Sequence, residues 1–333
     1  MSEQKLKIGV VGAGHLGKIH INCIKQIPSY ELVGFYDIDE NTAQEVSKKL
    51  NVPHFDTLEA LIANIDVLDV VVPTLYHYAC AVQAIQAQKH VFIEKPFTTT
   101  LQEAQSLIEL ALAYKVKIQV GHVERFNPAF LAVQSLAPQP LFIESHRLAQ
   151  FNPRGTDVSV VLDLMIHDID VIQSMIPSKV IKVDASGVAV VSETPDIVNA
   201  RITFENGAVA NVTASRISLK NMRKMRLFQQ DAYITMDFLE KKAEIFQLKN
   251  MSAPDARIKL KQALEKGEMP ENLHYETLPT PPVNAIKMEL ETFYEAIIQD
   301  TKPVVDMYDG YRALETAFMV IDNINKHLSS IKV

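Results

Sequence analysis

Two groups of polar residues in the sequence have the types and spacing that proton-transfer chemistry needs. In the first group, Glu94-Lys95-Pro96 follows an apolar run that we predict to be a strand. A partly desolvated lysine there could polarise a substrate hydroxyl or help to remove its proton. The same residues also fit a surface lysine paired with Glu94. Pro96 fixes the chain direction after Lys95 and permits a cis peptide bond before it.

The second group lies on a predicted helix from Val160 that is apolar nearly all round. Asp163, His167 and Asp170 fall at positions i, i+4 and i+7, which puts them on one face of a helix. A histidine flanked by carboxylates can accept a proton near neutral pH. A satisfied core histidine and a metal site are the alternatives. The spacing marks no further metal ligand, so we predict no metal site.

A third polar stretch, residues 122–128, follows another predicted strand. Arg125 offers a planar fork suited to a phosphate or a carboxylate, and Asn127 can bond a sugar or an amide. Asn127 followed by Pro128 also suits the start of a helix, with Asn127 as its N-cap. The two interpretations are compatible.

A glycine turn near the N-terminus predicts where a cofactor binds. The turn joins an apolar strand to an amphipathic helix and consists of Gly12, Ala13, Gly14, His15, Leu16 and Gly17. Gly12 permits the sharp turn, Gly14 lets a pyrophosphate approach the backbone, and Gly17 lets the helix pack closely. The phosphates would then face the positive end of the helix dipole.

Asp37 indicates which nucleotide that turn would bind. It ends a second apolar strand. A carboxylate there can accept hydrogen bonds from both hydroxyls of an adenosine ribose and would repel the 2′-phosphate of NADP. No Arg or Lys occurs between Asp37 and Ser47 to bind that phosphate. We therefore predict NAD and disfavour NADP. A turn or cap residue is the alternative for Asp37.

Alternating strands and helices from residue 8 to about 121 must position these groups. The predicted strands are Lys7–Val11, Leu32–Asp37, Val67–Val72, His90–Glu94 and Lys117–Gly121. This order predicts a Rossmann domain, an α/β fold with a doubly wound parallel sheet, whose ligands lie outside the carboxyl ends of the strands. The cofactor candidates just past those ends, besides the glycine turn, are Asp37, Pro73, Thr74, His77, Glu94, Lys95 and His122.

The second half of the chain has long alternating strands with short turns. They are predicted at Leu141–Ala149, Val180–Val191, Ile197–Phe204, Ala208–Ile217, Arg223–Gln229, Ala232–Asp237 and Glu244–Leu248. This pattern predicts an α+β domain with a large, mostly antiparallel open sheet. The helix from Val160 could cover one face of the sheet and a partner subunit's sheet the other, so we expect a homodimer or homotetramer. Residues 251–282 are predicted to be a long loop, followed by helices at Asn284–Gln299 and Asp309–Leu328.

The length and composition of the chain are those expected for an ordinary soluble protein. Its 333 residues, 47% of them hydrophobic, suggest two domains: a NAD-binding domain at 1–122 and a substrate-binding and oligomerisation domain at 123–333, whose last helices could pack back on the first. The net charge of -7 disfavours a nucleic-acid partner, and no apolar run is long enough for a membrane span. The first strand begins almost at once, which leaves no room for a signal peptide, and the two cysteines suit reduced packing residues. We expect a cytoplasmic protein.

Together these motifs resemble the glucose-fructose oxidoreductase / inositol dehydrogenase / MocA (Gfo/Idh/MocA) oxidoreductase family over nearly the full length. The matching pieces are Gly12–Gly17, Pro73–His77, His90–Pro96 and Asp163–His167. Within the family, residues 121–129 and 163–170 are similar to the UDP-N-acetylglucosamine 3-dehydrogenases. Gln88 departs from the glycine common in the family, at a helix end away from the chemistry.

The resemblance implies a function and a set of roles. Lys95 and His167 would form the catalytic pair, with Asp163 orienting or binding the substrate, and Asp163, Asp170, Arg125 and Asn127 are the substrate-binding candidates. We predict hydride transfer between NAD and a secondary alcohol of a sugar, with C3 of a UDP-N-acetyl amino sugar as the first hypothesis. The alternatives are a dehydrogenase of a free sugar or polyol, a reductase of a double bond, and a non-catalytic NAD-sensing regulator.

Overall fold

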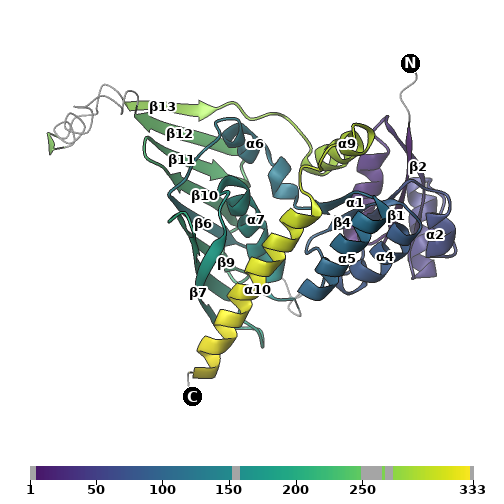
Figure 1. The fold of residues 1–333 in the computed structure, drawn as a ribbon, viewed down its shortest axis with the longest axis horizontal. Coiled ribbons are helices and arrows are strands. Elements are labelled where there is room, and N and C mark those ends of the chain that lie inside the picture. Colours follow the sequence, from purple (N-terminus) through teal and green to yellow (C-terminus); the bar gives the residue numbers. More distant parts are fainter. Residues whose placement is uncertain (1–4, 152–157, 249–264, 267–272, 331–333) are drawn as a thin grey trace. The chain divides into compact units, whose positions relative to one another are not determined.

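The structure is a computed structural model that describes residues 5–151, 158–248, 265–266 and 273–330. It divides into two compact units (Figure 1). Unit one comprises residues 1–126 and 283–315, and unit two comprises residues 127–282 and 316–333. The last part of the chain therefore contributes to both units.

Unit one is built on a parallel sheet, as predicted. Its strands are β1 (Leu6–Val11), β2 (Tyr30–Tyr36), β3 (Val67–Val70), β4 (His90–Glu94) and β5 (Ile118–Gly121), in the order β2-β1-β3-β4-β5. Because β1 pairs with β2 on one side and β3 on the other, the point where the winding reverses lies between β1 and β3. In a doubly wound sheet the ligand site lies at the carboxyl end of that point, where the glycine turn follows β1.

Helices and short 3₁₀ turns connect these strands. They are α1 (His15–Ile24), α2 (Glu40–Leu50), α3 (Leu58–Ile62), α4 (His77–Gln86), α5 (Leu101–Tyr114) and the 3₁₀ turns Thr74–Tyr76 and Val123–Phe126. Helix α9 (Ala285–Ile298), from the end of the chain, packs against α1 and β4. Its buried Leu290 and Phe293 join Phe92 in one apolar cluster, and the hydroxyl of Tyr30 donates to the carbonyl of Leu290 at 3.1 Å.

Unit two contains the predicted open sheet, in the order β13-β12-β11-β10-β6-β9-β8-β7. Its strands are β6 (Phe142–Leu148), β7 (Val180–Val188), β8 (Ile197–Phe204), β9 (Val209–Ser215), β10 (Met222–Phe228), β11 (Ala232–Asp237), β12 (Lys242–Leu248) and β13 (Leu273–Leu278). All neighbours are antiparallel except β6 and β9. Helices α6 (Pro128–Gln134) and α7 (Ile166–Met175) lie on the same face of this sheet (Figure 1). The mostly antiparallel architecture is therefore confirmed.

Two local predictions were wrong. Residues 273–278, which we predicted to be part of a long loop, form the edge strand β13 paired with β12; residues 251–264 and 267–272 of that prediction lie outside the described residues. Residues 161–165, predicted as the first turn of an α-helix, form a wider π-helical turn before α7. The remaining two predicted helices are confirmed as α9 and α10 (Met307–Ser330). No helix in the described part of the chain has the length and apolar character to cross a membrane.

Both cysteines are free and buried, as predicted for packing residues. Burial raises the pKa of the Cys80 thiol to about 11 and also raises the pKa of Cys23. We expect the native protein to react with a thiol reagent at about pH 8 at least tenfold more slowly than the unfolded chain, because the thiolate is the reactive form. Spectroscopic thiol counting tests this, with the denatured protein as control. Fast labelling of either cysteine in the native protein would contradict it.

Candidate active site

The glycine turn has the geometry that a dinucleotide site requires. Gly12 has φ of +96°, which only glycine adopts readily, and a Cβ there would lie 2.7 Å from the carbonyl oxygen of Val71. A Cβ on Gly17 would overlap the carbonyl oxygen of Gly12. The absence of a side chain at both positions therefore allows the close backbone contacts of the turn after β1 with the segment after β3 and with the start of α1.

Gly14 differs from these two because the space in front of it is open. No described atom lies within 4 Å of the position that a Cβ would occupy, and Gly14 is the N-cap residue of α1. Among the described residues, no side chain caps this helix and no acidic group stands in its first turn. The first amide groups of α1 can therefore receive a pyrophosphate, so these residues fit NAD.

Asp37 follows β2 and is bonded to the glycine turn. Its Oδ2 accepts from the backbone amide of Ala13 at 2.7 Å, and its Oδ1 accepts from the amide of Asp39 at 2.9 Å. The bond from Asp39 is the local turn contact that was the alternative interpretation of Asp37. The bond from Ala13 fixes the carboxylate beside the glycine turn. Each carboxylate oxygen keeps a second lone pair, so both bonds leave Asp37 able to accept from a ribose.

The glycine geometry predicts that two alanine substitutions both weaken NADH binding but differ in their effect on stability. Gly17→Ala should lower the free energy of unfolding by about 1–3 kcal/mol or more and abolish NAD binding, because the new methyl group overlaps the backbone of Gly12. Urea unfolding and a fluorescence titration with NADH measure both effects.

Gly14→Ala is the matched control because its methyl group enters open space. We expect its free energy of unfolding to stay within about 0.5 kcal/mol of the wild type, while its affinity for NADH falls. Wild-type NADH affinity in Gly17→Ala would refute the assignment of the turn.

Pro73, Thr74 and His77 form the connection between β3 and α4. His77 is buried, and its Nε2 and Nδ1 lie 2.9 Å and 3.0 Å from the carbonyl oxygens of Val72 and Pro96. Burial lowers the pKa of His77, which favours a neutral ring. In this structure the ring connects the segment after β3 to the segment after β4, and a contact with the cofactor stays a prediction.

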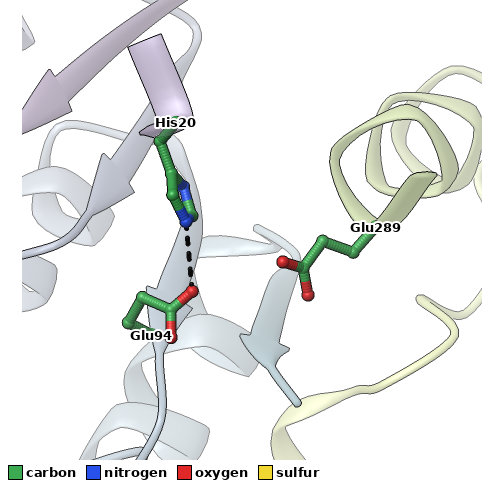
Figure 2. Close-up of side chains that lie close together, drawn as sticks. All are labelled: His20, Glu94 and Glu289. Atoms are coloured by element: carbon green, nitrogen blue, oxygen red, sulfur yellow. Dashed lines mark ion pairs between the residues drawn. The ribbon is translucent and has the colours of Figure 1, made fainter. Parts of the chain in front are cut away.

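Glu94, the last residue of β4, belongs to a buried polar cluster (Figure 2). Its Oε1 lies 3.2 Å from Nε2 of His20 on α1, whose Nδ1 lies 3.0 Å from Oδ2 of Asp69 on β3. Glu289 on α9 points its carboxylate toward the same place. Burial opposes a charge on His20, but Asp69 and then Glu94 outweigh it, so the pKa of the imidazole is raised well above its usual range.

Lys95 follows this cluster directly. Its backbone amide donates to Oε2 of Glu94 at 3.2 Å, and the Lys95–Pro96 peptide bond is cis, as the sequence permits. The side chain of Lys95 is half-buried. The carboxylate of Glu94 therefore helps to hold the backbone from which the lysine projects.

The polar residues after β5 make contacts that stabilise the fold. His122 is buried, and Nη2 of the buried Arg125 lies 3.7 Å from Oδ1 of Asp309. In unit two, Oδ1 of Asn127 accepts from the amide of Ala129 as the N-cap of α6, and its Nδ2 donates to the carbonyl of Phe238. The predicted cap is confirmed, and substrate binding by Arg125 and Asn127 stays a prediction.

The helix that carries the predicted base begins with the π-helical turn. Asp163 lies in that turn and is exposed, His167 is half-buried at the start of α7, and Asp170 is buried. A π turn is wound wider than an α-helix, so the simple i, i+4 spacing does not fix how Asp163 faces relative to His167. Single π turns are frequent at functional sites.

Sequence reasoning missed the group that anchors this helix. Arg147 on β6 and Asp168 on α7 form a buried bidentate ion pair, with Nε to Oδ2 and Nη2 to Oδ1 both at 3.0 Å. No local spacing marks the pair, because the partners lie on different elements. It fixes α7 against the sheet next to His167.

The structure thus gathers the cofactor candidates in unit one and the proposed base in unit two. Lys95, Glu94 and the glycine turn follow strands of one parallel sheet, and His167, Asp163 and Asp170 lie on one helical segment of the other unit. That Lys95 and His167 act on one substrate stays a prediction. The fold and the glycine turn define a class: a dinucleotide-binding protein with a doubly wound parallel sheet and a second domain built on an open sheet.

Comparison with known proteins narrows this class. Residues 6–122 match the oxidoreductase family with an NAD-binding Rossmann fold, and residues 134–235 match the GFO/IDH/MocA C-terminal domain. The chain belongs to the Gfo/Idh/MocA oxidoreductase family.

Similar relatives include sugar and polyol dehydrogenases. The UDP-N-acetylglucosamine 3-dehydrogenase of Acidithiobacillus ferrooxidans is 34% identical over 316 residues, which cover 95% of this chain and 96% of that protein. Its solved structure superposes with a TM-score of 0.87 over 97% of this chain and 98% of that chain, at 33% identity. The scyllo-inositol 2-dehydrogenase (NAD(+)) of Bacillus subtilis is 27% identical over 65% of this chain and 69% of its own length. The protein is therefore an NAD-dependent oxidoreductase of this family.

Proposed function

We propose that the protein oxidises the 3-hydroxyl of a UDP-N-acetyl amino sugar, with UDP-N-acetylglucosamine as the first candidate. The observation that carries this proposal is the likeness to the UDP-N-acetylglucosamine 3-dehydrogenase of Acidithiobacillus ferrooxidans over nearly the full length of both chains. The half-buried Lys95 after β4 and the half-buried His167 on α7 support it, because alcohol dehydrogenation needs a base for the hydroxyl proton and is assisted by a cation near the oxygen.

The proposed reaction is a balanced two-electron transfer. The C3–H bond of the sugar breaks, its hydride goes to C4 of the NAD nicotinamide, and the C3–OH proton goes to His167, which leaves a 3-keto sugar and NADH. Lys95 stabilises the negative charge that develops on the oxygen, and Asp163 binds or orients the substrate. Asp170, Arg125 and Asn127 remain further candidates for substrate contact.

A substrate panel tests the proposal. Purified protein with NAD⁺ should reduce the cofactor with UDP-N-acetylglucosamine at a kcat/KM at least about a hundredfold above that for N-acetylglucosamine, glucose and myo-inositol, because the nucleotide supplies binding contacts that free sugars lack. Absorbance of the reduced nicotinamide measures turnover, with a carbonyl trap to draw the reaction forward. Higher activity with a free sugar or polyol would refute the nucleotide sugar as the substrate and identify that compound instead.

The position of oxidation is tested separately with deuterium. UDP-N-acetylglucosamine labelled at C3 should transfer its deuterium to the cofactor, whereas label at C4 should stay on the sugar. Mass analysis of the recovered NADH distinguishes these cases. Deuterium transfer from C4 would refute oxidation at C3 while leaving the nucleotide sugar in place.

We also propose that the open sheet joins two copies of the chain. On the face opposite α6 and α7, one aromatic residue from each of five neighbouring strands forms a continuous row. The row consists of Phe142, Phe228, Tyr233, Phe246 and Tyr275, with successive ring centroids 5.8, 4.9, 5.9 and 4.6 Å apart. Phe228 and Tyr275 are exposed, which suits burial against a partner.

Phe228→Glu should therefore convert the oligomer to a monomer. A charge in the middle of an apolar interface is costly to bury, so the association should weaken by at least about tenfold. Light scattering after size exclusion measures the mass. Leu75→Glu, at an exposed apolar position in unit one, is the control and should keep the wild-type mass. Wild-type mass in Phe228→Glu would refute this interface.

A further inference from the structure

Four buried ionisable residues of unit one, which we name the His20 cluster, lie close together between the sheet and its helices. They are His20 on α1, Asp69 on β3, Glu94 on β4 and Glu289 on α9. His20, Asp69 and Glu289 are fully buried, and Glu94 is 7% exposed. The cofactor turn and the catalytic proposal above assign no role to Glu289 or Asp69.

The cluster carries more negative than positive charge. Three carboxylates face one imidazole, so even a protonated His20 leaves an excess of negative charge among groups that are shielded from water. The cluster therefore favours a positive charge that the described side chains do not supply.

Glu289 shows where that charge is missing. Neither of its carboxylate oxygens has a hydrogen-bond partner among the described residues, although the side chain is completely buried. A protonated carboxyl group would donate its hydrogen to an acceptor, and no such bond is present in the described part of the chain. Figure 2 shows the carboxylate aimed at Glu94 and His20 across a gap.

The geometry of three of these groups suits a common ligand. Nε2 of His20, a carboxylate oxygen of Glu94 and one of Glu289 all lie within 4.8 Å of one another, with Nε2 and Oε1 of Glu94 3.2 Å apart. Around a tetrahedral zinc ion with bonds of about 2.0–2.2 Å, ligand atoms lie roughly 3.4 Å apart. A small inward movement of the Glu289 side chain meets that requirement.

The outer contacts of the cluster are those that metal ligands usually have. Oδ2 of Asp69 lies 3.0 Å from Nδ1 of His20, so it can accept a hydrogen bond from the protonated Nδ1. The unprotonated Nε2 is then available to bind an ion. Oε2 of Glu94 accepts from the amide of Lys95, which leaves Oε1 facing inward. Gly121 on β5 leaves space for this carboxylate, because a Cβ there would lie 2.8 Å from Oε1.

We propose that His20, Glu94 and Glu289 bind one divalent cation of the zinc class. One imidazole nitrogen with two carboxylates favours Zn²⁺ over Mg²⁺ and Ca²⁺, which prefer oxygen ligands throughout. The ion would tie the cofactor helix α1 and the C-terminal helix α9 to the end of β4, next to Lys95. Its role is to hold these elements in place, and the hydride transfer does not pass through it.

Metal analysis of the full-length protein tests the site. The protein is unfolded with chelator and refolded with or without Zn²⁺, because a buried site exchanges slowly once folded, and loosely bound metal is removed on a chelating resin. We expect about one Zn²⁺ per chain and a higher melting temperature than for the metal-free protein. Visible absorption bands after refolding with Co²⁺ should show low-symmetry coordination by nitrogen and oxygen.

Two variants connect the metal to these residues. Glu289→Gln should retain less than about a tenth of the wild-type zinc, and Asp69→Asn should bind it about 10–100-fold more weakly, because Asp69 only orients His20. Glu276→Gln is the matched control: Glu276 also lies beside a histidine, with its carboxylate 3.3 Å from His274, but this pair is exposed on β13. Its zinc content should equal that of the wild type.

The outcomes decide the proposal. Zinc at the wild-type level in Glu289→Gln, or less than about a tenth of an ion in the refolded wild type, overturns it and leaves a buried water or a shared proton at the centre of the cluster. If Glu289→Gln does not fold, the stoichiometry and the cobalt spectrum of the wild type decide alone. None of these results depends on which sugar the enzyme oxidises.

Discussion

Replacing Lys95 or His167 by alanine should lower kcat by about 10²–10⁴-fold while the affinity for NADH stays within about threefold of the wild type. Lys95 follows β4 on a backbone held by Glu94, and His167 lies half-buried at the start of α7. Each would act on the same proton and the same developing charge at the sugar hydroxyl. Neither change alters the glycine turn, which is the predicted cofactor site.

The double variant makes this prediction sharper. If the two side chains act on one step, Lys95→Ala with His167→Ala should cost much less than the product of the two single losses. Steady-state kinetics with the best sugar of the panel, and NADH fluorescence for binding, measure both quantities. Lys48→Ala, at an exposed position, and His274→Ala, whose side chain is 43% exposed, are the matched controls and should keep wild-type turnover. Turnover near the wild type in either catalytic variant would refute its role.

The sequence predicts unit one well because its strands are short apolar runs, most of which end at or just before a polar or glycine residue. The backbone geometry requires glycine at positions 12 and 17, so the turn can be recognised from these two residues in the sequence. Strand β13 was missed because it is an edge strand with exposed polar residues and one neighbour, so burial imposes little pattern on it. The π turn before α7 was missed because its residues keep the apolar content of an ordinary helix.

The buried polar contacts between distant elements could not be predicted from the sequence. His20, Glu94 and Glu289 lie on three elements that are far apart in the chain, and only packing brings them together. Our prediction that the chain has no metal site came from the spacing around His167, and spacing detects only ligands on one element. Asp168 likewise stands beside His167 in the sequence, but its partner Arg147 lies on β6.

Removing Asp168 should destabilise unit two by about 3–5 kcal/mol, because Asp168→Ala leaves the guanidinium of Arg147 buried without its bidentate partner. Both side chains are almost completely buried, at 2% and 3% exposure. Since Asp168 precedes the buried Ile169 and follows His167, its loss should also loosen α7. Urea unfolding, together with hydrogen exchange at the amides of α7, measures the free energy of unfolding of this unit.

Two comparisons show whether burial is the cause. Arg226→Ala breaks an ion pair with Glu144 in the same sheet at 3.2 Å, but both partners are exposed, so the cost should be below about 1 kcal/mol. Arg147→Met combined with Asp168→Leu should recover most of the stability lost in Asp168→Ala, because apolar groups of similar size replace a buried pair at little cost. Equal losses in Asp168→Ala and Arg226→Ala would mean that the pair does not anchor the helix. If the double variant recovers stability but not turnover, the ion pair positions His167 rather than holding the fold.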